Sequence, residues 1–264
     1  MSHAQLSAPF RYAPLDYADA RDERSVETTS APMLRVRPAF VAKAMLGAVL
    51  TLVVLGSISR YVQTVLPADA YGGLREICFR FDLDRENTVP AWYSSIGLFA
   101  CGSLLGLIAS FTHQRGGRYV GHWGLLAVTF LYISLDESAS LHEILIQPMR
   151  RILDTGGLLY FAWVIPAAAI VCVYGLLFVK FLLYLPRRTG RLFLLAGLTY
   201  VGGAMGVELI GGALAEADGL LSLRYTIAMT IEETMEMLGV VLFLYALLDY
   251  LGAHFNGWST RVAA

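Results

Sequence analysis

The chain has 264 residues, of which 56% are hydrophobic and 16% charged, and its formal net charge is −1. This balance, with no basic stripe along the sequence, excludes the electrostatic signature of a nucleic-acid-binding protein. The three cysteines, Cys78, Cys101 and Cys172, form no CxxC pair and predict neither a disulfide framework nor a zinc site. Apolar runs of membrane-spanning length recur instead, which is typical of a polytopic membrane protein.

Residues 1–37 are polar and mixed in charge, and they contain no apolar stretch of the kind found in a signal peptide. We expect a disordered cytoplasmic tail there. A transmembrane domain is expected over residues 38–252, with an external loop at 61–91 and a short cytoplasmic tail at 253–264. The predicted fold class is therefore all-α, a polytopic integral membrane helix bundle.

Six apolar runs are long enough to cross roughly 30 Å of hydrocarbon at 1.5 Å per residue. Of the 20 Lys and Arg residues, 13 fall on the side of the N-terminus and 7 on the other side. This asymmetry predicts that both termini are cytoplasmic, and we expect a bacterial inner (plasma) membrane. The six predicted spans are Phe40–Ser59, Trp92–Phe111, Trp123–Ile146, Leu158–Leu185, Leu192–Leu214 and Tyr225–Leu251.

The fifth predicted span is rich in glycine. Gly202 and Gly206 form a small-xxx-small pair, a pattern that lets neighbouring transmembrane helices approach closely. These glycines, or Pro166 within the fourth span, would also permit a break or hinge in a helix.

Titratable residues interrupt three of the six runs, and the other three have no acid in their middles. Counted from the proposed outer end of each helix, most of them fall at one level in the outer half of the bilayer. This coincidence of depth predicts a shared polar site formed by three helices. Its residues are Asp136, Glu137, His142, Glu143, Glu208, Glu232, Glu233 and Glu236.

Helical spacing predicts which of these side chains share a face. At 100° per residue, Asp136 and Glu143 differ by about 20°, and Glu232 and Glu236 are an i, i+4 pair. His142 projects more than 90° from the line of Asp136 and Glu143, so we expect it to contact a different helix. Glu143 is the acid expected to lie nearest to solvent.

An ionised carboxylate at mid-bilayer costs roughly 2.5–3.5 kcal/mol, so seven would cost on the order of 20 kcal/mol. That exceeds the ~5–15 kcal/mol net stability of a typical fold. No Lys or Arg lies within the three runs, and Arg150, Arg151 and Arg224 stand near their ends. Protons, water or bound cations must therefore compensate the acids.

Carboxylates with a single imidazole suit Fe or Mn better than Zn or Cu. The leading hypothesis is a divalent metal or dimetal site formed by the eight residues, in a membrane enzyme, an oxidoreductase or hydrolase, that acts on a lipid-soluble substrate. The sequence departs from the Glu-x-x-His pattern of di-iron bundles, because Glu137 and His142 are five residues apart. No phosphate loop or nucleotide fingerprint appears, so no nucleotide cofactor is expected.

Three alternatives stay open. The same acids would suit a cation- or proton-coupled transporter of a small ionic substrate. The chain could be an accessory subunit of a larger membrane complex, or assemble as a homo-oligomer. In the structural interpretation, protonated acids hold the helices together through hydrogen bonds.

The stretch "FDLDREN" before the second span alternates Asp82, Asp84 and Glu86 in the manner of a calcium loop. An EF-hand would require Gly in place of Asn87 and Glu in place of Tyr93, so that motif fails. An external cation site, or a lid over the acids, is one interpretation of the three carboxylates. A solvated turn leading into the second span is the other.

Overall fold

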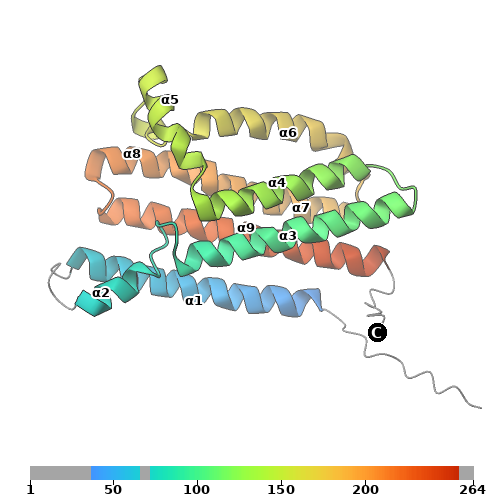
Figure 1. The fold of residues 1–264 in the computed structure, drawn as a ribbon, viewed down its shortest axis with the longest axis horizontal. Helices are drawn as coiled ribbons and strands as arrows, with labels where there is room; N and C mark the ends of the chain where they lie inside the picture. The colour runs from blue at the N-terminus through green and yellow to red at the C-terminus, as the bar shows by residue number, and fades with distance from the viewer. Residues whose placement is uncertain (1–36, 66–71, 256–264) are drawn as a thin grey trace, which may run out of the picture. The chain divides into compact units, whose positions relative to one another are not determined.

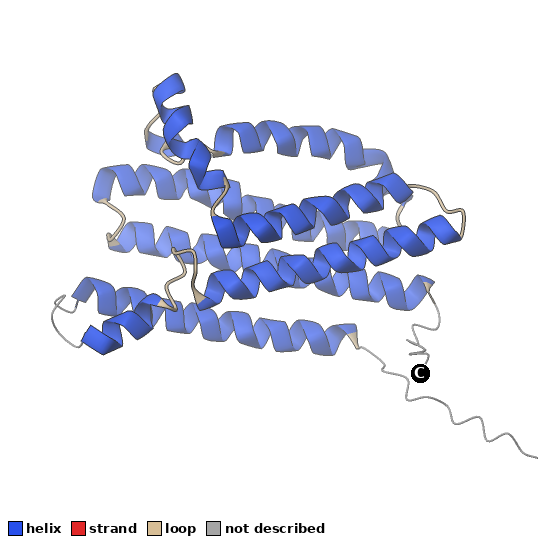
Figure 2. Ribbon diagram, in the orientation of Figure 1, coloured by secondary structure: helices blue, strands red, loops and turns tan. Residues whose placement is uncertain are grey.

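The structure is a computed structural model that describes residues 37–65 and 72–255. The expected N-terminal tail lies outside these residues, apart from its last position, and so does most of the expected C-terminal tail. Residues 35–258 form one unit, to which every described residue belongs. Within the described ranges all regular structure is helical, as Figure 2 shows, and no strand is present. The all-α prediction is confirmed.

Nine α-helices and three shorter helical segments make up the described residues (Figure 1). They are α1 (Pro38–Val65), α2 (Gly72–Phe79), α3 (Val89–Gln114), α4 (Val120–Ala139), η1 (His142–Leu145), α5 (Ile146–Leu153), η2 (Gly157–Leu159), α6 (Val164–Tyr184), α7 (Arg187–Val201), the π-helical segment η3 (Gly202–Val207), α8 (Glu208–Asp218) and α9 (Leu223–His254).

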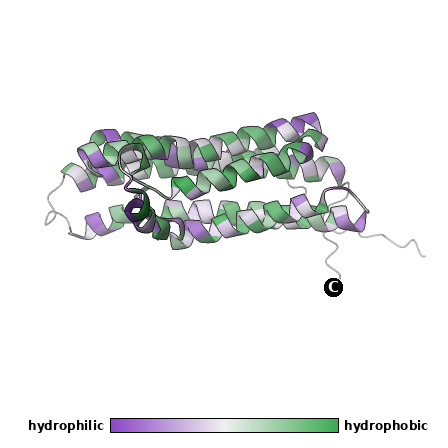
Figure 3. Cartoon of the chain, turned by 90° about the horizontal axis from the view of Figure 1, so that it is seen from above, coloured by the Kyte–Doolittle hydropathy of each residue, from purple (hydrophilic) through white to green (hydrophobic). Residues whose placement is uncertain are grey.

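Five of these helices are long and apolar enough to cross a membrane: α1, α3, α6, the continuous α7–η3–α8 helix, and α9. The bent pair of α4 and η1–α5 would be a sixth. Large apolar side chains point outward, such as Leu176 and Leu183 of α6, which are 80% and 81% exposed. Figure 3 shows the same pattern, with hydrophobic residues along the helices. Such surfaces are stable only against lipid or another protein, so the chain is a polytopic helical membrane protein.

The third predicted span, Trp123–Ile146, is correct as a straight helix only as far as Ala139. Helix α4 ends at Ala139, because Ser140 adopts the left-handed conformation with φ of 50°. The following segment, His142–Leu153, turns by 76° from the axis of α4. The apolar run continues through this bend, so hydropathy alone gave no sign of it.

The predicted hinges have different outcomes. Pro166 lies in the first turn of α6, where a missing N–H costs little, and α6 continues without a break to Tyr184. The glycine-rich stretch of the fifth span does depart from α-helical geometry, since Gly202–Val207 is π-helical. Such segments interrupt the regular ladder of backbone hydrogen bonds and are frequent at functional sites.

Helix α9 packs against α1, α3, α7 and α8, and α3 runs along α4. One core, rich in aromatic side chains, joins α9 to α3, α4, α6 and α7; it includes Trp123, Phe181 and Phe193. A second core lies between α1 and α9 and includes Val49 and Met229. We call the end of the bundle at which α1 ends and α9 begins the loop end, because α2 and residues 80–88 lie there (Figure 1).

Candidate functional site

Two carboxyl groups from different helices meet near the loop end. Glu208 opens α8 and Glu232 lies in the third turn of α9, and their side chains are in hydrogen-bonding contact. A Cβ added at Gly211 would stand 3.8 Å from Glu232 Oε2 and 3.9 Å from Glu208 Oε2. Two ionised carboxylates repel one another when they lie close together, and a shared proton would relieve this repulsion.

The other acids of α4 and α9 surround this pair. Glu137 of α4 lies within electrostatic range of both Glu233 and Glu236, and Glu232 lies within range of Glu236. All of these side chains are half-buried. We call the set the acid cluster; its members are Asp136, Glu137, Glu208, Glu232, Glu233 and Glu236.

Two aromatic side chains adjoin the acid cluster. Trp163, just before α6, donates from Nε1 to Glu208 Oε1 at 3.0 Å. The hydroxyl of Tyr200 on α7 lies close to Glu236. Trp163 precedes α6, whereas Tyr200 lies on the continuous α7–η3–α8 helix that also carries Glu208. Side chains from α4, α9, this helix and the start of α6 therefore contribute to one polar region.

Glycines let α9 approach the helix that carries Glu208. A Cβ at Gly203 would lie 2.9 Å from the Glu232 carbonyl oxygen, and one at Gly239 would lie 2.7 Å from Tyr200 Cβ. Both distances are shorter than a carbon atom tolerates. The close approach predicted for the fifth span is therefore present, although the crowded positions are Gly203 and Gly239; a Cβ at Gly206 would meet nothing within 4 Å.

His142 lies beside Asp136, contrary to the prediction that it would contact only another helix. Its Nδ1 is 2.9 Å from Asp136 Oδ2, and its backbone N–H donates to Asp136 Oδ1 at 2.8 Å. The helical wheel failed because the helix ends at Ala139, and the η1 turn brings His142 back over α4. Its ring also packs on Trp163, with ring centroids 4.7 Å apart. Glu143 is exposed on the same turn, as expected.

No ion pair within the described residues joins Lys or Arg to a member of the acid cluster. Of the three arginines near the span ends, Arg224 pairs with Asp218 at 3.0 Å, and Arg150 lies 4.4 Å from the centroid of the Tyr160 ring. Arg151 is exposed. The cluster's charge therefore has no cationic side chain to balance it among these residues.

A metal site would require several side chains of the acid cluster around one point. Among the described residues, no three His, Cys, Asp or Glu side chains are placed so that they could hold a metal ion. The carboxylates lie in pairs and chains, not around one point. The predicted divalent cofactor stays a prediction.

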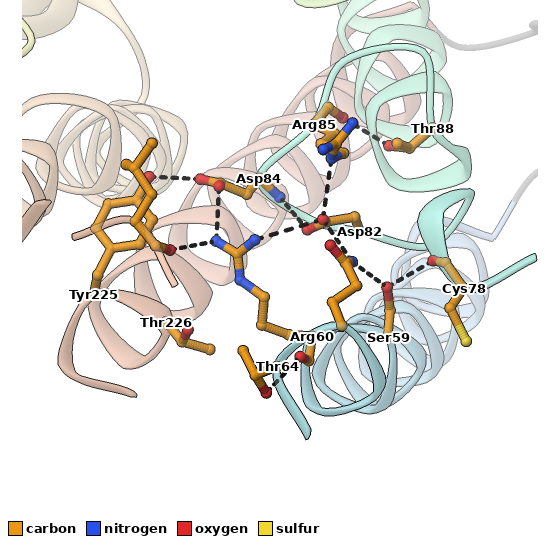
Figure 4. A network of polar contacts seen from close by, with 12 residues as sticks. Ser59, Arg60, Thr64, Cys78, Asp82, Asp84, Arg85, Thr88, Tyr225 and Thr226 are labelled. Carbon is orange, nitrogen blue, oxygen red and sulfur yellow. Dashed lines mark hydrogen bonds and ion pairs between the residues drawn. The ribbon is translucent and has the colours of Figure 1, made fainter. Parts of the chain in front are cut away.

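The carboxylates before the second span have a different environment. Figure 4 shows Arg60, from the end of α1, between the loop at residues 80–88 and the start of α9. Its guanidinium lies 2.7 Å from Asp84 Oδ2 and 3.6 Å from Asp82 Oδ2. Asp82 is fully buried and also accepts from Gln63 Nε2 at 2.8 Å. The prediction of a solvated turn is wrong for these two aspartates, whose charges arginine already balances.

This loop connects to the acid cluster through Tyr225 of α9. The Tyr225 hydroxyl donates to Asp84 Oδ1 at 2.6 Å, and the ring edge lies close to Gly211, beside Glu208 and Glu232. Burial raises the pKa of Asp84, whereas the Tyr225 hydrogen bond and the Arg60 charge oppose that rise. We call Arg60, Asp82, Asp84, Arg85 and Tyr225 the arginine network.

Glu86 faces away from the arginine network, toward the break after α4. Its carboxyl lies close to Ser140, and the charges of His142 and Glu143 act on it. Burial raises the pKa of Glu86 to about 7, the charge of His142 opposes this rise, and Glu143 and Asp136 reinforce it. The pKa of the Glu86 carboxyl therefore lies near neutral pH.

A family model described as a domain of unknown function, DUF8692, matches residues 43–251. The chain belongs to the DUF8692 family. The match covers every helix described here from α2 to α8 and most of α1 and α9, so both the acid cluster and the arginine network lie within the family domain. No curated protein and no solved structure matches the chain.

The sequence interpretation missed the partners of the acids. Trp163, Tyr200 and Tyr225 were not predicted as site residues, and Arg60 was counted only among the loop charges. Tyr and Trp near span ends are common membrane anchors, which hides any further role. The contact of Arg60 with Asp82 and Asp84 depends on how the loop folds back on α1, and no local spacing encodes that.

Proposed function

We propose that this DUF8692 protein is a membrane transport protein that moves protons through the acid cluster. The observation that carries the proposal is the contact between Glu208 and Glu232, two carboxyl groups of membrane-spanning helices without a cationic partner among the described residues. A pair that shares one proton gains and loses it readily when a neighbour changes charge. Intramembrane carboxylates of this kind are typical of proton pathways.

Contacts between proton-carrying groups on either side of Trp163 support this role. Asp136 lies beside His142, whose ring touches Trp163, and Trp163 donates to Glu208. Beyond Glu232, the groups continue to Glu236 and the Tyr200 hydroxyl. Carboxyl, imidazole and hydroxyl groups can each accept a proton on one side and release one on the other. The indole donates only, so Trp163 orients Glu208 and passes no proton.

A metal-dependent enzyme is the competing proposal, and its residues would be the same acids with His142. The arrangement favours protons, because no three of these side chains are placed to hold a metal ion among the described residues. Fe or Mn sites need several oxygen or nitrogen ligands around one point.

The test is proton flux into liposomes that contain the purified protein, driven by a potassium diffusion potential and read with a trapped pH dye. We expect flux above that of protein-free liposomes. In Glu232→Gln it should fall by about 100-fold, since a positioned proton-transfer group contributes roughly 10²–10⁴ in rate. Asp218→Asn is the matched control: it neutralises an acid at the end of α8 that pairs with Arg224, and it should conduct like the wild type.

Wild-type liposomes that conduct no better than empty ones would overturn the proposal, as would full flux in Glu232→Gln. Elemental analysis of the same preparation tests the competing proposal. Near-stoichiometric iron or manganese that is lost in Glu233→Gln/Glu236→Gln would identify a metalloenzyme.

A further inference from the structure

Helix α5 is a short amphipathic helix outside the bundle. At 100° per residue, Ile146, Met149, Ile152 and Leu153 share one face, and Gln147 and Arg151 lie on the opposite face. Ile152 is 71% exposed and Leu153 48% exposed. Figure 1 shows α5 projecting away from the other helices, and its main contact is with η1, the turn that precedes it.

The apolar surface extends into η1. Ile144 and Leu145 are 66% and 42% exposed, so one segment presents four exposed large aliphatic side chains. In a soluble protein such a surface would mark a docking site. Here the position of the segment along the chain restricts what can cover it.

That position is the boundary between bilayer and water. Helix α5 stands between α4, whose 20 residues measure about 30 Å at 1.5 Å per residue, and the span α6. The segment His142–Leu153 turns by 76° from α4. Because transmembrane helices tilt on average only about 20° from the bilayer normal, a turn of this size brings α5 close to the membrane plane.

We infer that α5 is an interfacial helix that docks on the phospholipid surface, with Ile144, Leu145, Ile152 and Leu153 inserted among the acyl chains. Its basic residues fit the same partner. Arg151 stands on the polar face, and Arg150 flanks the apolar face with its guanidinium over the Tyr160 ring. Both are placed to reach lipid phosphates at the level of the headgroups.

Docking of α5 on the lipid would also position His142, which lies beside the acid cluster. His142 belongs to the η1 turn that begins this segment, and its contacts with Asp136 and Trp163 depend on where the turn lies. A lipid surface that fixes α5 therefore also fixes the imidazole. This consequence concerns anchoring only and does not depend on what the acid cluster carries.

The test uses spin labels on the two faces of α5. In a Cys172→Ser background, which removes the exposed native thiol, Ile152→Cys and Gln147→Cys are labelled in nanodiscs of phosphatidylcholine and phosphatidylglycerol. We expect the ratio of collision with oxygen to collision with a water-soluble nickel chelate to be severalfold higher at position 152. Leu183→Cys, on the exposed face of α6, provides the value for a lipid-facing site.

Equal, nickel-dominated exposure at positions 147 and 152 would overturn the inference, since α5 would then lie in water. Dipolar broadening at position 152 that disappears on dilution with unlabelled protein would also overturn it, because a second copy of the chain would then cover the face. Both substitutions are at exposed positions, and circular dichroism of the labelled variants verifies that the bundle is folded.

Discussion

Two groups of acidic residues lie near the loop end of the bundle, and they are compensated in opposite ways. In the arginine network, Asp82 and Asp84 face Arg60, with Arg85 3.5 Å from Asp82. In the acid cluster, no ion pair to Lys or Arg exists within the described residues, and carboxyl groups contact each other, His142 and aromatic donors.

The difference separates a structural use of charge from a functional one. An ion pair between a guanidinium and carboxylates keeps both partners charged, so the arginine network fixes the loop between α1 and α9. Carboxyl groups without a cation must exchange protons to relieve their repulsion, so the acid cluster can change state without unfolding. If this distinction is correct, neutralising a charge in the two groups has opposite consequences for stability.

The largest effect is expected from Arg60→Met. The substitution leaves fully buried Asp82 and half-buried Asp84 without their main cation, and breaking a buried pair in this way costs about 3–5 kcal/mol. The midpoint of thermal unfolding in mild detergent should fall by on the order of 10 °C. Arg85→Gln is the control: the Arg85 side chain is 58% exposed, and losing its ion pair should cost at most ~1 kcal/mol.

A second variant separates charge from packing at this position. Arg60→Met/Asp82→Asn/Asp84→Asn removes the unpaired carboxylates, and it should recover a large part of the lost stability. If Arg60→Met unfolds no earlier than Arg85→Gln, the network is not what holds the loop, and the comparison between the two groups fails.

The spanning helices could be predicted from the sequence, whereas the break after α4 could not. The spanning helices follow from hydropathy, because a run of about 20 apolar residues has few alternatives to a membrane. The similar depths of Glu208 and Glu232 along their helices follow from counting residues from the helix ends. The break at Ser140 does not, since a single left-handed residue within an apolar run has no signature in composition.

The same limit explains the error at His142. The helical wheel holds only while the helix continues, and past Ala139 it assigned His142 and Glu143 to faces that do not exist. Contacts between segments distant in sequence, such as Tyr225 with Asp84, depend on tertiary packing alone. The acids themselves were predictable because charge within an apolar run is conspicuous, whereas their aromatic partners were not.

The opposite outcome is expected for Glu233→Gln in the acid cluster. Glu233 has no hydrogen-bond partner in the described contacts and stands within range of Glu236 and Glu137. Replacing it by a neutral isostere removes repulsion, so the unfolding midpoint should stay the same or rise, by no more than ~1 kcal/mol in free energy. A loss comparable to that of Arg60→Met would mean that the acids hold the helices together, as in the structural interpretation of the sequence.

The last effect is a change of slope with pH, and it concerns Glu86, which belongs to the loop of the first group but faces the second. Burial raises its pKa from an ordinary value of 4.5 to about 7 in the folded protein. The folded state therefore binds more protons than the unfolded state between these two values, and the Glu86 contribution to stability falls as the pH rises through this window and is constant outside it. In Glu86→Gln, the decline of the unfolding midpoint with pH should be shallower than in the wild type. The control is Glu76→Gln, which neutralises an exposed acid on α2 and should keep the wild-type slope. If the unfolding midpoint of Glu86→Gln instead ran parallel to that of the wild type over this pH range, the Glu86 carboxyl would not take up a proton on folding.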